Sequence, residues 1–455
     1  MTRVLAVEGM SGSALELLVS RRFGPLFACQ FLSAFNDNAV RNALVLMIAY
    51  RADAASHFSA QLLIPLAAGL FMLPFFVCSA TAGQIADESD KAWLIRLIKL
   101  LEIPVMLAAA GGVLAGSETV LLALLFTMGI QAAFLGPLKY AILPDLLAPE
   151  ELLLGNALVE AGTFAAILLG TIAAMVIATR HGSEAVALLI VTVALAAWVT
   201  SREIPPTSPA AHPSLPRWNL VTATGRVIRQ IASEPVPLRL ILGISWFWLA
   251  GAIYLSQFPS YVRFILGAEE AVVTLFLTSF SIGIALGSLL CNRLLSGNAS
   301  ARWAPWGALG IALFSIDFWL ASPNPAGPRD LVSFGEFLGD PAHWRILADL
   351  FGIAVSGGIF VVPLYALLQL ATDREHRARA IAANNIINAA AMVISSGATI
   401  ALIAAGISIS GLFLITGAAT LAVAALFWHS LPGLTARPSW SSARPADERR
   451  ESGVS

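Results

Sequence analysis

Long apolar runs alternate with short polar breaks along the whole chain, and this pattern predicts membrane-spanning helices. A span takes about 20 apolar residues, because a helix advances about 1.5 Å per residue and the hydrocarbon core is about 30 Å thick. Twelve runs are long enough. They lie at residues 23–50, 61–86, 92–116, 119–143, 156–179, 184–200, 238–262, 271–292, 304–322, 345–370, 379–404 and 409–430. The sequence therefore predicts an all-α membrane protein with twelve transmembrane helices.

The composition agrees with this fold class and narrows the function. The chain is 58% hydrophobic and 12% charged, whereas soluble domains are about 45–50% apolar and about 25% charged. Its three cysteines and six histidines form no disulfide framework or metal-ligand spacing, so no cofactor or metal is expected. The net charge of −1 gives no reason to expect a nucleic-acid partner. No nucleophile, metal or acid–base constellation is present, so we do not expect an enzyme.

Two long polar segments divide the chain. Residues 1–200 are predicted to form one half with six helices, and residues 238–430 a second half with six more. Residues 201–237 are rich in Pro, Ser and Arg, which suits a cytoplasmic linker, and residues 431–455 are expected to be a disordered cytoplasmic tail.

Basic residues in short loops predict the orientation, because cytoplasmic loops accumulate Lys and Arg. With both termini inside, 21 of the 27 basic residues fall on the cytoplasmic side. The six others are Arg41, Arg51, Arg180, Arg263, Arg329 and Arg345. We therefore expect both termini in the cytoplasm.

The two halves share a local plan. Residues 136–160 and 362–388 each contain a proline near the end of a span, a charged loop, and a second span that opens with polar residues. Asn156 and Glu160 in the first copy match Asn384 and Asn388 in the second, each pair on one helix face. Two parallel repeats of six helices around a midplane site are the plan of the major facilitator transporters.

A short loop between the second and third spans, GQIADESDK, resembles the Gly-x-x-x-Asp loop motif of the same transporters. Gly83 allows close helix approach, and Asp87 can face the N-terminus of a neighbouring helix, where its charge is favourable. Lys91 supplies a basic residue of the motif. The second-half copy, residues 287–293, lacks the aspartate. The motif indicates the fold and loop packing, and it does not indicate a substrate.

The first span carries Asn36, Asp37, Asn38 and Arg41 in an otherwise apolar run. Asp37 is about 21 Å along a helix that begins at Phe23, near the middle of the bilayer. Charges at this depth face a bundle interior or a wet cavity. Asp37 and Arg41 can pair across one turn, and such a pair would fix this span against its neighbours. The additional amide groups favour a substrate cavity instead.

Five segments together resemble the lysophospholipid transporters of the major facilitator superfamily. These segments are QFLSAFNDN, GPLKYAILPDLL, GNALVEAGTFAAILLGT, SWFWLAGAIYLSQFP and HRARAIAANNIINA. The similarity is greatest to the transporter half of proteins fused to a 2-acylglycerophosphoethanolamine acyltransferase. It implies movement of lysophospholipids, chiefly lysophosphatidylethanolamine, from the outer to the inner leaflet of the bacterial inner membrane for reacylation. It also implies functional roles for Asp37, for Lys139 with the adjoining Tyr140, and for Glu160.

The chain departs from this family in two respects. Some members carry an arginine in the seventh span, where this chain has only Tyr254 and Gln257 as polar candidates. The chain also lacks an acyltransferase domain and the HxxxxD pair of such enzymes, so a separate acyltransferase is a possible partner.

Other polar positions complete the candidate site. Lys139 and Glu160 are expected at the cytoplasmic ends of the fourth and fifth spans, where they are either interfacial residues or a paired gate. Trp246, Ala250, Tyr254 and Gln257 share a face of the seventh span, which either packs or lines the cavity. Asp317 is expected at the outer membrane interface, with proton coupling as the lesser option.

The favoured interpretation is a transporter that rocks its halves around a cavity, in which Asp37 holds the headgroup ammonium and Arg41 or Lys139 the phosphate. The alternative is a major facilitator exporter of a drug or small metabolite that uses Asp37 for proton coupling. A membrane anchor for a separate acyltransferase, which would tolerate the loss of Asp37, is the third interpretation.

Overall fold

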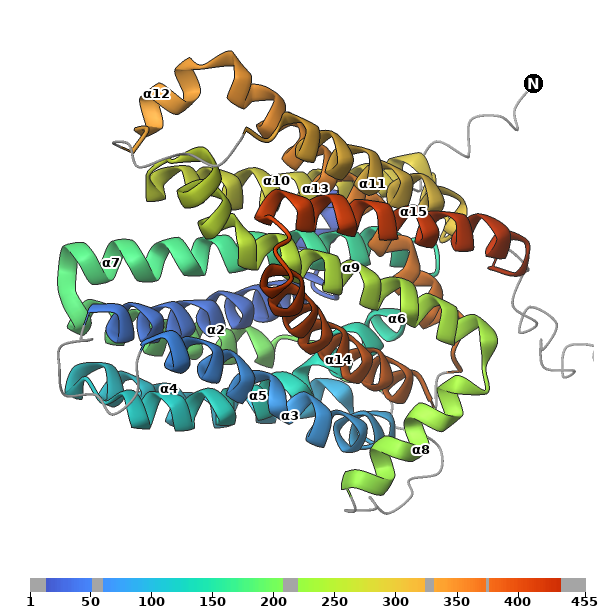
Figure 1. Ribbon diagram of the computed structural model, residues 1–455. Helices are drawn as coiled ribbons and strands as arrows, with labels where there is room; N and C mark the ends of the chain where they lie inside the picture. Colours follow the sequence, from blue (N-terminus) through green and yellow to red (C-terminus); the bar gives the residue numbers. More distant parts are fainter. Residues whose placement is uncertain (1–13, 51–59, 208–219, 324–330, 374–375, 435–455) are drawn as a thin grey trace, which may run out of the picture.

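The computed structural model describes residues 14–50, 60–207, 220–323, 331–373 and 376–434, and nearly all of these are helical (Figure 1). The helices of the first half are α1 (Ala14–Val19), α2 (Gly24–Tyr50), α3 (Ala60–Glu88), α4 (Lys91–Ala115), α5 (Glu118–Ala141), α6 (Leu143–Leu146) and α7 (Leu152–Arg202). Helix α8 (Leu220–Ala232) follows. The second half contains α9 (Pro235–Ser260), α10 (Glu270–Leu294), α11 (Ala304–Ala321), α12 (Phe334–Gly339), α13 (Pro341–Leu370), α14 (Arg377–Ala404) and α15 (Ile409–Leu434). A π-helical turn, Tyr261–Leu266, extends α9, and a 3₁₀ turn, Ala301–Trp303, precedes α11.

The predicted all-α membrane fold is confirmed. In the described residues, eleven helical segments are long and apolar enough to cross a membrane. The twelfth predicted span is α2, whose polar side chains at positions 36–38, 41 and 42 lower its hydropathy. Helix α7 contains two spans, Leu152–Ala178 and Arg180–Arg202. The helix is kinked at Gly182, near the start of the second span, where the φ of +78° is a conformation that favours glycine.

The helices pack as two groups. In the N-terminal group, α2 and α4 pack on α7, while α3 and α4 pack on α5. In the C-terminal group, α13 packs on α10 and α11, and α11 also packs on α15. Contacts between the groups run mainly along α7 with α10 and along α3 with α14. Figure 1 shows most C-terminal helices, in yellow to red, above the N-terminal helices, in blue to green.

Helix α8 lies within the segment that we predicted as a cytoplasmic linker. Val227 and Ile231 are buried, whereas Arg226 and Arg229 are exposed, so the helix is amphipathic. Its apolar face packs mainly on α3 and also on α14 and α9. We call the end of the bundle at which α8 lies, on the right in Figure 1, the linker side, and the opposite end the far side.

Some predictions fall on residues outside the described part of the chain. These are residues 208–219 of the linker and 435–455 of the tail, with Arg3, Arg51, Arg217, Arg329, Arg374, Arg437, Arg444, Arg449 and Arg450.

Candidate functional site

The two asparagines of α2 that are predicted to bind substrate form hydrogen bonds within the bundle. Asn36 is fully buried, and its Nδ2 donates to the carbonyl oxygen of Ile190 in α7 at 3.1 Å. Asn38 donates to Ala34 one turn earlier at 2.7 Å. Asn42 donates to the carbonyl of Asn38 at 2.8 Å and to Thr171 of α7 at 3.0 Å. The role of these amides in a substrate cavity stays a prediction, and periodicity alone does not tell which neighbour an amide faces.

Asp37 and Arg41 share a face of α2, but among the described residues they form no ion pair within 4 Å. The Arg41 guanidinium instead lies over the ring of Phe71 in α3, 4.7 Å from its centroid. Such a cation–π contact is worth more when it is desolvated. Asp37 is half-buried and interacts electrostatically with Arg41 and with charged groups on other helices, Lys99, Glu102 and Lys139. The structure thus shows no simple pair of Asp37 with Arg41, but a cluster of charged side chains from several helices.

Two members of this cluster, Lys99 and Glu102 of α4, were missed by the sequence analysis. Lys99 was counted among the cytoplasmic basic residues and Glu102 was not considered. Lys99 is 2% exposed and Glu102 3%, and they form an ion pair with each other inside the bundle. The ammonium of Lys99 also donates to the hydroxyl of Ser33 in α2. The available signal was the charge of Lys99 and Glu102 inside the apolar run 92–116, which also contains Arg96.

Lys139, Tyr140 and Glu160 lie deeper than predicted. Helix α6 continues almost directly from α5, so Lys139 is about 10 Å from the linker-side end at Leu146, and Glu160 is about 12 Å inside α7. The hydroxyl of Tyr140 donates to Glu160. Lys139 lies over the ring of Tyr140, 4.9 Å from its centroid. Lys139 and Glu160 interact electrostatically, but the described residues show no ion pair between them. A gate made by that pair stays a prediction, and in this conformation the partner of Glu160 is Tyr140.

Other contacts close the linker side between the two groups. The rings of Tyr140 and Tyr365 stack with centroids 4.4 Å apart, and Trp248 donates to the hydroxyl of Tyr365 at 3.0 Å. About 6 Å nearer the linker-side end, Asn156 of α7 and Gln369 of α13 exchange two hydrogen bonds of 2.8 and 2.9 Å. Both amides are fully buried. Asn156 thus connects the two groups of helices.

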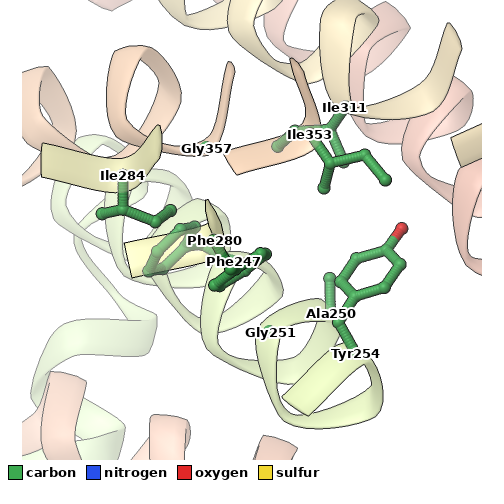
Figure 2. Close-up of a pocket in the computed structure, with 9 residues that line it drawn as sticks. All are labelled: Phe247, Ala250, Gly251, Tyr254, Phe280, Ile284, Ile311, Ile353 and Gly357. Atoms are coloured by element: carbon green, nitrogen blue, oxygen red, sulfur yellow. The ribbon is translucent and has the colours of Figure 1, made fainter. Parts of the chain in front are cut away.

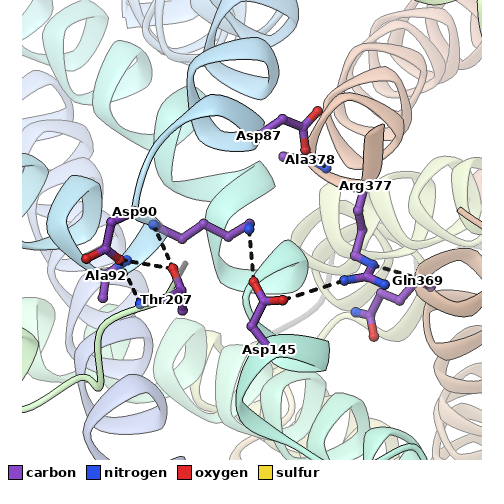
Figure 3. Close-up of polar contacts among 9 residues, drawn as sticks. Asp87, Asp90, Ala92, Asp145, Thr207, Gln369, Arg377 and Ala378 are labelled. Atoms are coloured by element: carbon purple, nitrogen blue, oxygen red, sulfur yellow. Dashed lines mark hydrogen bonds and ion pairs between the residues drawn. The ribbon is translucent and has the colours of Figure 1, made fainter. Parts of the chain in front are cut away.

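The loop motif makes the outermost of these contacts (Figure 3). Asp87 accepts hydrogen bonds from the backbone of Ala378 at 2.7 Å and of Arg379 at 3.1 Å, at the N-terminus of α14. The side chain of Arg379 adds an ion pair at 2.9 Å. A Cβ added to Gly83 would lie 2.6 Å from the Cβ of Ala382 in α14, so this glycine permits the close approach of α3 and α14.

Lys91 takes part in a second ionic connection at this edge. It is the first residue of α4, 2% exposed, and its ammonium is 2.9 Å from a carboxylate oxygen of Asp145 in α6. The other oxygen of Asp145 is 3.9 Å from Arg377 of α14. Asp145 therefore connects the N-terminal group to the C-terminal group.

The preceding residue, Asp90, caps α4 and holds the start of the linker. Burial opposes ionisation of the Asp90 carboxyl. Its pKa nevertheless lies below the ordinary value, because the carboxylate accepts hydrogen bonds from the backbone and hydroxyl of Thr207, both at 3.0 Å, and from the backbone of Ala92. This cap fixes where α4 begins and fastens residues 201–207 to it.

In the C-terminal group, the predicted stripe on α9 divides between two environments. Trp246 donates to Thr420 of α15 at 3.1 Å, and Gln257 contacts only Ser256 at 3.4 Å among the described residues. Tyr254 is buried, with its hydroxyl 2.6 Å from that of Ser315 in α11. Only Tyr254 and Ala250 of the stripe line a hollow.

This hollow is apolar and lies between α9, α10, α11 and α13 (Figure 2). In this conformation its free volume is about 10 Å³, room for about one water molecule. Its lining residues are Phe247, Ala250, Gly251, Tyr254, Phe280, Ile284, Ile311, Ile353 and Gly357. In Figure 2 the ring of Tyr254 and the side chains of Ile311 and Ile353 lie on one side, and Phe247, Phe280 and Ile284 lie on the other.

The remaining polar candidates of this group lie elsewhere. Asn388 accepts a hydrogen bond of 2.6 Å from Ser245 of α9, and Asn384 is fully buried in α14. Asp317 forms a bidentate contact with Arg345, at 3.1 and 2.5 Å, with both side chains exposed at the far side. This exposed position agrees with the prediction that Asp317 lies at the outer membrane interface.

Comparison with known proteins identifies the family. Residues 26–328 match the Major Facilitator Superfamily. A protein named lysophospholipid transporter LplT from Serratia proteamaculans (strain 568) is 30% identical over 369 residues, which cover 77% of this chain and 81% of that protein. A protein of the same name from Escherichia coli O1:K1 / APEC is 29% identical over 388 residues, 84% of this chain and 88% of that protein.

Solved structures show the same fold at low identity. The Escherichia coli fucose:proton symporter FucP aligns with a TM-score of 0.65 at 14% identity, over 90% of this chain and 97% of that one. A bacterial homologue of the iron transporter ferroportin aligns with a TM-score of 0.65 at 15% identity, over 90% and 99%. The matched relatives are transporters, and the helices are those of a multi-pass membrane protein. The chain belongs to the major facilitator superfamily and, within it, to the family of the lysophospholipid transporters.

Proposed function

We propose that the protein carries lysophospholipids, chiefly lysophosphatidylethanolamine, from the outer to the inner leaflet of the bacterial inner membrane. The observation that carries this proposal is the contrast between the two groups of helices. The N-terminal group encloses charged side chains, and the C-terminal group encloses an apolar hollow. A lysophospholipid has one charged headgroup and one acyl chain, and therefore needs both environments.

The headgroup would bind among the charges of the N-terminal group. Asp37 is the carboxylate suited to an ethanolamine ammonium, because it is half-buried and has no ion pair within 4 Å in the described residues. Lys139 or Arg41 would hold the phosphate, and each of them lies over an aromatic ring, Tyr140 and Phe71 respectively. Charge-assisted hydrogen bonds of this kind are about twice as strong as neutral ones.

The acyl chain would enter between the helices that line the apolar hollow of the C-terminal group, and the hollow would widen to admit it. Its lining contains three aromatic rings and three isoleucines, with the hydroxyl of Tyr254 satisfied by Ser315. An acyl chain there would contact apolar atoms and displace no polar partner. Each methylene transferred from water gains about 0.8 kcal/mol, so the chain supplies binding energy and the headgroup supplies selectivity.

Alternation of access would proceed by opening the linker side. We infer that this side is cytoplasmic, because most basic loop residues among the described ones lie there. They are Arg21, Arg22, Lys91, Arg202, Arg226, Arg229, Arg293, Arg302, Arg377 and Arg379. The contacts of Asp87, Asp145, Asn156 and Tyr140 would then hold the cytoplasmic side closed, and the two groups would rock apart there to release the lipid.

We also infer that the protein has no enzymatic activity of its own and that a separate cytoplasmic acyltransferase reacylates the released lipid. The exposed arginines of α8, Arg226 and Arg229, are a basic surface at which such a partner could dock. Replacing both by glutamine should leave lipid entry unchanged and slow its reacylation. Unchanged reacylation by that variant would remove α8 as the docking surface.

The direct test of transport measures radiolabelled lysophosphatidylethanolamine uptake into spheroplasts that contain or lack this protein. We expect uptake only with the protein, followed by exposure of the label to the cytoplasmic leaflet. Equal uptake in both preparations would refute the proposal. The alternative substrate class would be supported if the protein instead lowered the accumulation of a small hydrophilic metabolite or drug.

A further inference from the structure

Helix α4 carries a buried ion pair inside the N-terminal group. Lys99 and Glu102 lie about 12 and 16 Å from the linker-side start of α4 at Lys91, and they are 2% and 3% exposed. A lysine at the end of a membrane helix usually extends its ammonium to the interface. Lys99 instead directs its ammonium into the bundle, where it contacts Glu102 and Ser33.

These contacts place the pair beside the headgroup site. Ser33 is one helical turn before Asp37 on α2, so the ammonium of Lys99 lies against the helix that carries Asp37. Asp37 interacts electrostatically with both Lys99 and Glu102. One oxygen of Glu102, Oε1, is buried and has no hydrogen-bond partner in the described residues. The pair is thus close to the site, and its acceptor capacity is not fully used.

Stability does not explain why the pair is present. Replacing a buried ion pair with well-packed apolar residues is often neutral or stabilising, because removing two charges from water costs about as much as their attraction returns. Charges at this depth in a membrane helix also make insertion less favourable. A functional reason is therefore required.

Charge balance supplies one. The electrostatically linked cluster contains three carboxylates, Asp37, Glu102 and Glu160, and three cations, Arg41, Lys99 and Lys139. Its formal charge is zero, from three positive minus three negative groups. A site that is neutral before binding remains neutral with a zwitterionic lipid and becomes negative with an anionic one. In a low-dielectric interior that difference has a large effect on binding.

We propose that Lys99 and Glu102 are positioning residues that set the net charge of the headgroup site and so determine its selectivity between zwitterionic and anionic lysophospholipids. They act through Asp37. Lys99 offsets the negative charge of Asp37, and Glu102 in turn offsets the positive charge of Lys99. This inference rests on the proposed function and names the residues that tune the same site.

The test compares uptake of lysophosphatidylethanolamine, a zwitterion, with that of lysophosphatidylglycerol, an anion, in spheroplasts. The variants are Lys99→Met, Glu102→Gln and their combination. Lys99→Met should raise the ratio of zwitterion to anion uptake about tenfold, because the site becomes negative. Glu102→Gln should lower the ratio by a similar factor. The double variant, again neutral, should return to within about twofold of the wild-type ratio.

Two matched controls separate charge from packing. Ser33→Ala removes a hydrogen bond to Lys99 without changing charge, and Lys99→Arg keeps the charge in a different shape. Both should retain the wild-type ratio even if total uptake falls. The ratio does not depend on how much protein is inserted, so partial misfolding of a variant does not imitate the effect.

The outcomes are distinct. Opposite shifts of the two single variants, with recovery in the double variant, support the inference. Equal loss of both substrates, shifts in the same direction, or no recovery in the double variant overturns it. Wild-type protein that takes up neither lysolipid would refute the proposed function itself, which is a different result.

Discussion

The amide pair between Asn156 and Gln369 should control how firmly the linker side is closed. The two side chains exchange hydrogen bonds of 2.8 and 2.9 Å, and Nδ2 of Asn156 also donates to the carbonyl of Leu152 at 2.8 Å. The side-chain amide of Gln369 has no other partner in the described residues, and its backbone carbonyl accepts from Arg377 at 3.0 Å. When the groups separate, both amides can bond to water. Disrupting the pair should therefore destabilise the closed state and leave the open state little changed.

The two single substitutions should differ in size. Gln369→Met leaves one buried atom, Oδ1 of Asn156, without a partner, which costs about 1–3 kcal/mol. Asn156→Leu leaves both the oxygen and the nitrogen of Gln369 without partners, about twice that cost. Since about 1.4 kcal/mol is a tenfold change in an equilibrium, the open population should rise at least about fivefold in the first variant. The rise should be larger in the second.

Replacing both residues should largely reverse the effect. The double variant Asn156→Leu with Gln369→Met places two apolar side chains of similar shape against each other and leaves no unpaired amide. Removing both partners of a hydrogen bond in this way is often nearly neutral. The coupling between the two positions should therefore be strong, as expected for side chains in direct contact.

Distances between spin labels would measure the closure. Glu150, before α7, and Asp373, after α13, are exposed on the linker side of the two groups and suit cysteine labelling. The background would carry alanine at the three native cysteines, Cys29, Cys78 and Cys291. Single variants should add a population with a longer distance, and the double variant should lose most of it. Wild-type distance distributions in both single variants would refute the reasoning, as would a double variant no closer to wild type than Asn156→Leu.

Three shorter predictions concern the transport cycle. Asp37→Asn should abolish lysolipid uptake with normal membrane insertion, because asparagine keeps the shape but not the charge; uptake at the wild-type rate would assign Asp37 a structural role. A protonophore should change the initial uptake rate by less than about twofold if Asp37 binds the headgroup, whereas strict dependence on the proton gradient would favour proton coupling. The charge swap Lys139→Glu with Glu160→Lys should not recover the activity lost in Lys139→Glu, since Glu160 bonds to Tyr140. Lysolipid uptake is compared among the wild type, the single variant and the swap. Recovery in the swap would instead support a direct ionic gate between the two residues.

The fold could be predicted from the sequence because hydropathy is a sum over a whole span. The predicted runs 92–116 and 409–430 correspond to spans of Lys91–Ala115 and Ile409–His429. A single misplaced residue changes such a sum little. Helix α8 was missed for the opposite reason. It alternates apolar and polar positions over only a few turns, and its apolar face has meaning only once α3 and α14 are in place.

The candidate site was predicted less completely, because contacts depend on rotation and depth. Asn36, Asp37 and Asn38 are consecutive and point in different directions, and the sequence did not tell which of them faced α7. The depth of Lys139 was misjudged because the short helix α6 continues beyond residue 143, where the predicted run ends. Asp87 was easier, since a carboxylate in the last turn of a helix has few favourable buried partners other than the N-terminus of another helix.

Lys99 and Glu102 show how such errors arise and what they conceal. A basic residue near the start of a span fits the orientation rule equally well whether its ammonium reaches the interface or points inward. Here the side chain of Lys99 points inward and pairs with Glu102, three residues later on the same helix. The run as a whole remains apolar enough to be predicted as a span. A charged pair within one helix is therefore inconspicuous in the sequence. Its position against Ser33, one turn from Asp37, makes it part of the chemistry of the site.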